Sequence, residues 1–167
     1  VKVEVKRCTE ARPVFGIIRI DNVSEVTADM TDMEKSALLS DVTERVLSYF
    51  SSRDGFIKQY STTDFVTCIS QKALADMMEE NFDILDRVRE IHTVNRIPVT
   101  LSIGVVQSED SFARQFEEAQ VSLDLALGRG GDQAIVRIGK DVRAFGGKSP
   151  TAVSSTRVRV RVVAQAL

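Results

Sequence analysis

The 167-residue sequence contains no Trp, one His and two cysteines, and aromatic residues make up only 6% of it. Cys8 and Cys68 are too few for a disulfide framework, so we expect two free thiols in a reducing cytosol. The apolar runs are far shorter than the ~20 residues that span a bilayer. The first residues form no signal-peptide core, and the missing initial Met suggests a piece of a longer protein.

The charge of the chain is unevenly spread, although the net value is only −2. Residues 13–136 carry an excess of Asp and Glu, whereas residues 1–12 and 137–167 carry an excess of Lys and Arg. An acidic body does not attract nucleic acid, so nucleic-acid binding is not expected. It also repels polyphosphates unless a metal ion or local arginines intervene.

Hydrophobic periodicity predicts strands and helices in the order βαββαβαβ. Runs rich in Val, Ile and Phe indicate the strands, and apolar residues at helical spacing indicate the helices. This order, with a hairpin between two crossovers, is typical of an α+β, ferredoxin-like sheet with helices packed against it. Strands are expected at 14–21, 56–60, 65–69, 98–105 and 134–138, and helices at 28–52, 74–88 (with a break near Asn81) and 112–127.

The flanks of this pattern predict linkers. Residues 1–12 mix charged and apolar residues, and the Gly- and Ser-containing stretch within 140–167 breaks the periodicity. We therefore expect one folded domain over 13–139. Residues 157–163 alternate Arg and Val like a strand but precede helix-forming residues, so their state stays open.

Three segments carry a resemblance to the GGDEF domain of diguanylate cyclases. The run 17–21 resembles that family's opening strand, and Tyr60-Ser61-Thr62-Thr63-Asp64-Phe65 stands where the family has Tyr-Gly-Gly-Asp/Glu-Glu-Phe. The most specific segment is 100–105, Thr-Leu-Ser-Ile-Gly-Val, which is close to a strand motif of the family. The resemblance covers about residues 13–138 and implies a nucleotidyl-cyclase type of fold.

The resemblance implies that two carboxylates hold metal ions in that family, and that these ions support the phosphoryl transfer which joins two GTP molecules. Here Arg19 and Thr63 stand at those two positions, and a cation and a hydroxyl cannot hold two Mg²⁺ ions. Ser61 and Thr62 replace glycines that let GTP approach the backbone, and only Asp64 keeps its carboxylate. Further mismatches fall where the family contacts phosphates or product: Gly128, Asp132, Ser52 and Gly55.

Residues 125–133, Leu-Ala-Leu-Gly-Arg-Gly-Gly-Asp-Gln, resemble the degenerate GGDEF domain of GdpP-like membrane phosphodiesterases of cyclic di-AMP. That resemblance implies an upstream PAS-like domain joined through 1–12 and a DHH-type phosphodiesterase domain beyond 140–167. It also implies a homodimeric parent protein, with this domain on the cytoplasmic side and anchored only through upstream membrane helices.

Two sets of residues are candidates for a nucleotide site, because the end of the first strand and the hairpin tip are expected to meet. They are Asp21 and Asn22, and Ser61, Thr62, Thr63 and Asp64. Asp21 and Asp64 are the candidate ligands of a single metal ion, Mg²⁺ arriving with ATP or GTP. The alternative is that these polar residues only cap turns.

Three other features have ordinary explanations. Gly130-Gly131-Asp132 resembles the cyclase signature but follows a helix, so a helix stop is expected. Gly147-Lys148-Ser149 lacks the preceding glycine of a P-loop. His92 has no second ligand nearby in the pattern and is expected at the surface.

The sequence thus favours a regulatory, nucleotide-binding module that is no diguanylate cyclase. The resemblance adds weak ATP hydrolysis through Asp21 and Asp64. A structural dimerisation or relay spacer without ligand is the alternative, and a cyclase with rearranged ligands is a third hypothesis.

Overall fold

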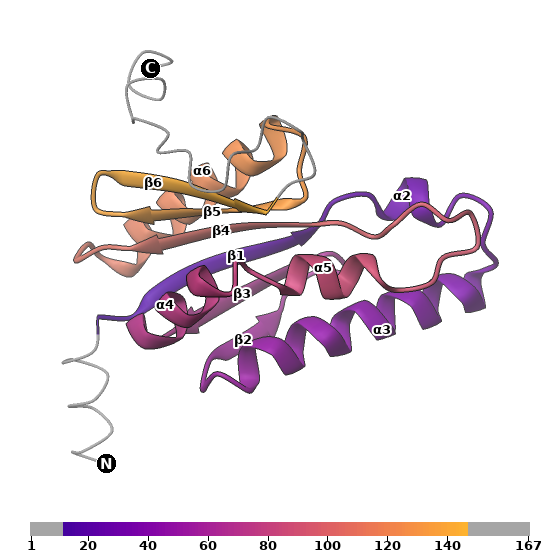
Figure 1. Cartoon of the computed structure of the whole chain (residues 1–167), viewed down its shortest axis with the longest axis horizontal. Coiled ribbons are helices and arrows are strands. Elements are labelled where there is room, and N and C mark those ends of the chain that lie inside the picture. The colour runs from indigo at the N-terminus through magenta and orange to yellow at the C-terminus, as the bar shows by residue number, and fades with distance from the viewer. Residues whose placement is uncertain (1–11, 147–167) are drawn as a thin grey trace.

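The computed structural model describes residues 12–146, which form a mixed β-sheet with helices on both faces (Figure 1). Helices α3, α4 and α5 cover one face, and α6 covers the other. The elements follow in this order: β1 (Val14–Ile20), α2 (Val23–Val26), α3 (Asp32–Ser51), β2 (Phe56–Gln59), β3 (Asp64–Ile69), α4 (Gln71–Glu79), α5 (Ile84–Arg89), β4 (Leu101–Gln107), α6 (Phe112–Gly128), β5 (Gln133–Ile138) and β6 (Asp141–Gly146).

The sheet has the strand order β2-β3-β1-β4-β5-β6. All neighbours are antiparallel except β4 and β5, which run parallel because α6 crosses between them. In the centre, Arg19 of β1 lies opposite Asp64 of β3 on one side and opposite Ser102 of β4 on the other. This register puts three polar side chains in one row across the sheet.

Local sequence signals explain where the helices begin and end. Thr31 caps α3 by accepting from the Glu34 N–H, and Glu34 reciprocates at the Thr31 N–H, which forms a capping box. Ser111 caps α6 in a similar way. Between α4 and α5, Asn81 and Phe82 both adopt positive φ and end the first helix. The predicted break near Asn81 is therefore confirmed.

The larger core lies between the sheet and α3, α4 and α5, where the central strands bury Val, Ile and Phe side chains. The opposite face packs against α6 around Phe15, Ile17 and Leu123. Gly104 of β4 allows this packing, because a Cβ there would run into the backbone of α6 at Ala119 and Leu123. Because Gly104 has no Cβ, the backbones of α6 and β4 lie in direct contact.

The predicted α+β fold and the order of its elements are confirmed, but the structure adds α2 and β6. The interpretation of 141–146 as linker is wrong, because β6 pairs with β5 from Asp141↔Ile138 to Gly146↔Gln133. This edge strand is stabilised by contacts distant in sequence, such as that of Phe145 with Phe82, which lies between α4 and α5. Residues 1–11 and 147–167 lie outside the described range, so the predictions for them stay predictions.

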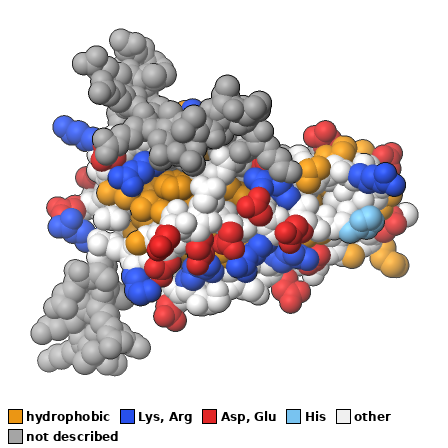
Figure 2. Space-filling view, viewed as in Figure 1, with side chains coloured by type: hydrophobic (Ala, Val, Ile, Leu, Met, Phe, Trp, Pro, Cys, Tyr) orange, Lys and Arg blue, Asp and Glu red, His pale blue; other side chains and the backbone are white. Residues whose placement is uncertain are grey.

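On the α4–α5 side of the molecule, acidic side chains (red) and basic side chains (blue) are intermixed at the surface (Figure 2). His92 is exposed, as expected, and Met77 is fully buried in the core. Within residues 12–146, no helix combines the length and the apolar character needed to cross a membrane.

Candidate functional site

The hairpin between β2 and β3 ends in a compact hydrogen-bonded tip built around Asp64. The Ser61 hydroxyl donates to Asp64 Oδ2 at 2.7 Å, and the Thr63 hydroxyl donates to the same oxygen at 3.0 Å. Ser61 Oγ also accepts from the backbone N–H groups of Thr63 and Asp64. Thr62 is exposed at the apex. Three of the four predicted tip residues therefore form one cluster, and the cluster holds the tip in shape.

Arg19 joins the hairpin tip to the centre of the sheet. Its Nε lies 2.5 Å from Asp64 Oδ1. Burial alone would raise the pKa of Asp64, but the hydrogen bonds from Arg19, Ser61 and Thr63 outweigh it and leave that pKa below its ordinary value. Asp64 is thus a charged acceptor, and both of its oxygens are already bonded.

Asp21 belongs to a separate cluster, on the β4 and β5 side of β1. Its Oδ2 accepts from the Ser102 hydroxyl at 2.8 Å and from the Asp132 N–H at 3.0 Å, while its buried Oδ1 accepts no hydrogen bond within the described part of the chain. Burial raises the pKa of Asp21, and the hydrogen-bond donors around it offset that rise only in part. A Cβ at Gly131 (φ +71°) would lie 2.8 Å from Oδ2, so glycine is needed there.

The loop at 130–132 is the expected helix stop, and it also completes the Asp21 cluster. The Gly131 N–H bonds back to the Ala126 carbonyl, while Asp132 adopts positive φ. Arg89 of α5 donates through Nε to both carboxylate oxygens of Asp132, at 2.8 and 2.7 Å. The loop thus connects α6, the end of β1 and α5.

Both polar atoms of the Asn22 side chain form hydrogen bonds with the backbone. Its side-chain Nδ2 donates to the Pro98 carbonyl at 2.8 Å, and its Oδ1 accepts from the Thr100 N–H at 3.0 Å. These bonds tie the end of β1 to the segment entering β4. This arrangement is the turn-capping role that the alternative interpretation foresaw for such residues.

The two predicted metal ligands bond to different partners in the structure. Asp64 faces Arg19, whereas Asp21 faces Ser102 and the Asp132 N–H. Among residues 12–146, no group of three or more His, Cys, Asp or Glu side chains could hold a metal ion. A hard divalent ion needs several oxygen ligands. The residues present do not fit the metal pair of the cyclases.

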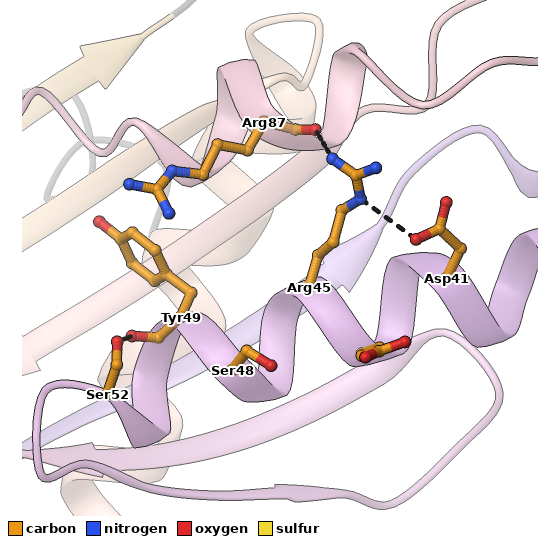
Figure 3. Close-up of a pocket in the computed structure, with 7 residues that line it drawn as sticks. Asp41, Arg45, Ser48, Tyr49, Ser52 and Arg87 are labelled. Carbon is orange, nitrogen blue, oxygen red and sulfur yellow. Dashed lines mark hydrogen bonds and ion pairs between the residues drawn. The ribbon is translucent and has the colours of Figure 1, made fainter.

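A second polar region lies on the other side of the sheet, between α3 and α5. A groove of about 500 Å³ runs between these helices (Figure 3). Arg45 spans it, donating to Asp41 on its own helix and to the Arg87 carbonyl on α5. Its lining residues are Asp41, Glu44, Arg45, Ser48, Tyr49, Ser52 and Arg87.

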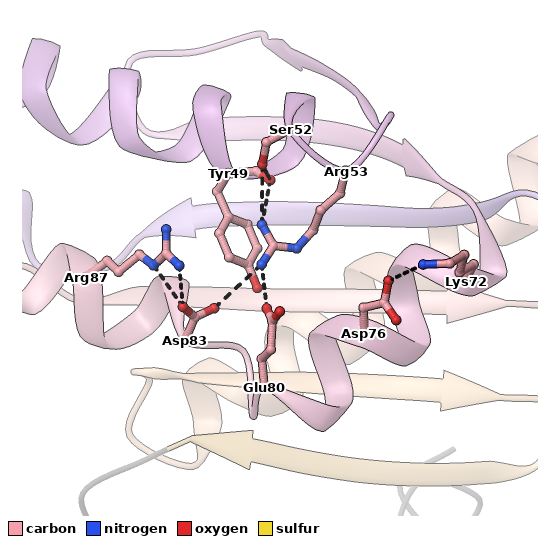
Figure 4. Close-up of polar contacts among 8 residues, drawn as sticks. All are labelled: Tyr49, Ser52, Arg53, Lys72, Asp76, Glu80, Asp83 and Arg87. Atoms are coloured by element: carbon pink, nitrogen blue, oxygen red, sulfur yellow. Dashed lines mark hydrogen bonds and ion pairs between the residues drawn. The ribbon is translucent and has the colours of Figure 1, made fainter.

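Beside this groove, Tyr49 forms the centre of a network that we call the Tyr49 network: Tyr49, Arg53, Glu80, Asp83 and Arg87 (Figure 4). The Arg53 guanidinium stacks on the Tyr49 ring, 3.9 Å from its centroid, and pairs with Glu80. The buried Tyr49 hydroxyl makes no hydrogen bond among the described residues, and burial raises its pKa. Arg53 is therefore turned inward at the segment where the cyclases carry their product-binding motif.

Comparison with solved structures identifies the class of this fold. The active GGEEF domain of a diguanylate cyclase from Vibrio cholerae aligns with a TM-score of 0.64 and 16% identity, covering 81% of this chain and 88% of that one. A diguanylate cyclase/phosphodiesterase structure from Caldicellulosiruptor saccharolyticus gives 0.67 and 13%, over 84% and 85%. The domain has the GGDEF fold.

The family within this class follows from sequence comparison. Residues 18–144 match the family described as cyclic-di-AMP phosphodiesterase GdpP-like, GGDEF domain, and the chain belongs to that family. It is 41% identical to the cyclic-di-AMP phosphodiesterase PdeA of Listeria monocytogenes, over 97% of this chain and 25% of that protein. Identity to GdpP of Bacillus subtilis is 37%, over 93% and 24%. The chain thus spans about a quarter of the length of these relatives.

Sequence reasoning missed the partners of the candidate residues. Ser102 lies in the strand motif at 100–105, and its position opposite Arg19 would have marked it as a neighbour of the candidate residues. Asp132 lies in the 130–132 loop, and its backbone N–H contact with Asp21 has no sequence signal, because 111 residues separate the two. The Arg53–Tyr49 stacking is local, and i,i+4 spacing on a helix could have suggested it.

Proposed function

We propose that this domain is a regulatory module without cyclase activity, in a protein that hydrolyses cyclic di-AMP through a part outside this chain. The observation that carries the proposal is the 2.5 Å pair between Arg19 Nε and Asp64 Oδ1. A guanidinium in this position repels divalent ions, and coupling of two GTP molecules needs them to neutralise phosphate charge.

The nucleotide part of the proposal rests on the hairpin tip. Ser61 and Thr62 are exposed at the hairpin tip and Thr63 is half-buried, so their hydroxyls could contact a bound ATP or GTP. A Mg²⁺ ion would then come with the nucleotide phosphates. Slow ATP hydrolysis is the finer form of this proposal, and it would be slow because Asp21 and Asp64 are both occupied by protein donors. In the parent protein, we place the domain in a homodimer, on the cytoplasmic side of a membrane anchor.

The test incubates the chain with GTP and Mg²⁺ or Mn²⁺, and separately titrates ATP and GTP by calorimetry. We expect no cyclic di-GMP and a measurable binding heat that falls in a Ser61→Ala, Thr63→Ala double variant. Formation of cyclic di-GMP would disprove the proposal. Absence of binding heat for both nucleotides would remove its nucleotide part.

A relay or dimerisation spacer without ligand is the second candidate, favoured by exposed aromatic residues beside α6. Phe112 is 69% exposed and packs edge-on against Phe15 of β1, with ring centroids 5.0 Å apart. Phe56 of β2 is 62% exposed and lies opposite Cys68, on the same face. Sedimentation of the chain tests this candidate: a dimer that a Phe112→Ser variant dissociates supports it, and a strict monomer contradicts it.

A further inference from the structure

The cluster of Arg19, Ser61, Thr63 and Asp64, which we call the hairpin cleft, contains one cation that belongs to the protein itself. Arg19 projects from β1 on the α6 face of the sheet, between Asp64 of β3 and Ser102 of β4. Its side chain is 34% exposed, whereas that of Asp64 is 12% exposed. The Arg19 guanidinium is therefore partly exposed, and it contacts a carboxylate that is largely covered.

The charge next to this guanidinium is that of Asp64. The hydrogen bond to Asp64 raises the pKa of Arg19, in spite of partial burial, and the charges of Asp64, Tyr60 and Asp124 of α6 add to the rise. Asp21 follows Arg19 by two residues, so its side chain leaves the same face of the sheet. The largely covered Asp64 carboxylate lies directly against Arg19, and a positive charge beside it stabilises its ionised form.

In diguanylate cyclases, which share this fold, divalent ions supply the positive charge, but the residues here do not fit such ions. We propose that Arg19 is the resident cation of the hairpin cleft: it replaces the divalent ion and holds the hairpin tip against β1. The structure of the domain is then independent of Mg²⁺. The cleft also becomes a metal site when Arg19 is exchanged for an acidic residue, since the new carboxylate then lies opposite that of Asp64.

The test measures thermal unfolding and Mn²⁺ binding of the full 167-residue chain, with EDTA or with Mn²⁺ at equal ionic strength. Mn²⁺ binding is followed by loss of the free-ion EPR signal. For the wild type we expect the same Tm in both conditions and no bound Mn²⁺. Arg19→Asp should have a lowered Tm in EDTA that Mn²⁺ restores, and it should bind Mn²⁺ about tenfold or more tightly than Arg19→Gln.

Arg19→Gln is the matched control, because it removes the cation without adding a ligand. We expect it to lower the Tm equally with and without Mn²⁺, whereas Arg19→Lys should keep a Tm that Mn²⁺ does not change. If Arg19→Asp does not fold in EDTA, refolding with Mn²⁺ present tests the same point, and failure to recover contradicts the proposal. Mn²⁺ binding by the wild type, or an unchanged Tm in Arg19→Gln, would also overturn it. This inference rests on the same Arg19–Asp64 pair as the proposed function, but its readouts involve no nucleotide, so its failure is distinguished from a failure of nucleotide binding.

Discussion

The hairpin cleft and the Tyr49 network both place arginines against carboxylates, on opposite faces of the same sheet. In the cleft, both oxygens of Asp64 are bonded, by Arg19 and by two hydroxyls. In the Tyr49 network, the buried Tyr49 hydroxyl has no hydrogen bond among the described residues, and Arg53 is shared between Glu80 and Asp83.

The difference indicates that the hairpin cleft is sensitive to substitution of a polar group, whereas the Tyr49 network tolerates it. A fully satisfied cluster defines one geometry, because every change leaves a charge or a hydroxyl without its partner. A partly satisfied cluster gains most of its stability from stacking and packing, here the Arg53 guanidinium on the Tyr49 ring. The two regions should therefore respond differently to substitutions that remove one polar group.

The largest expected effect is at Asp64. Asp64→Ala leaves Arg19 and two hydroxyls without their acceptor, and we expect it to lower the free energy of unfolding by about 2 kcal/mol, since the partial exposure of Arg19 reduces the cost. Urea unfolding at neutral pH measures it. Thr62→Ala at the exposed apex is the matched control and should change stability by less than about 0.5 kcal/mol. Equal effects of the two variants would contradict a special role of Asp64.

The second prediction uses pH to distinguish the two carboxylates near β1. The pKa of Asp64 is lowered in the native state, so its contribution is present above the unfolded pKa and is lost as the pH falls through the folded pKa. The pKa of Asp21 is raised, so its ionisation costs stability as the pH rises from the unfolded pKa through the folded one.

Urea unfolding of Asp64→Asn and Asp21→Asn between about pH 3 and pH 7 measures both contributions. The loss of unfolding free energy in Asp64→Asn, relative to the wild type, should become smaller towards low pH. The free energy of unfolding of Asp21→Asn, relative to that of the wild type, should be highest at neutral pH and should decrease as the pH falls. Parallel curves for the two variants would contradict the opposite shifts.

The smallest expected effect is at Tyr49. Tyr49→Phe removes a buried hydroxyl that has no hydrogen-bond partner, while the ring and its contact with Arg53 stay. Stability should therefore stay within about 0.5 kcal/mol of the wild type, as measured by urea unfolding. A loss comparable to that of Asp64→Ala would show that the Tyr49 network is as fully bonded as the cleft.

Much of the architecture could be predicted from local pattern. The β1 run, the capping residues Thr31 and Ser111, and the break at Asn81 each act within a few residues, and all are seen in the structure. The edge strand β6 could not be predicted, because it depends on pairing with β5 and on the contact of Phe145 with Phe82.

The candidate site divides in the same way. The sequence by itself determined that an arginine and a threonine stand where acidic residues would bind metal, since residue type requires no coordinates. Only the tertiary structure decided that Arg19 lies against Asp64, while Asp21 turns to Ser102 and the Asp132 N–H. The reason is register: strand pairing selects which side chains face each other across the sheet, and the crossover of α6 brings the 130–132 loop to the end of β1.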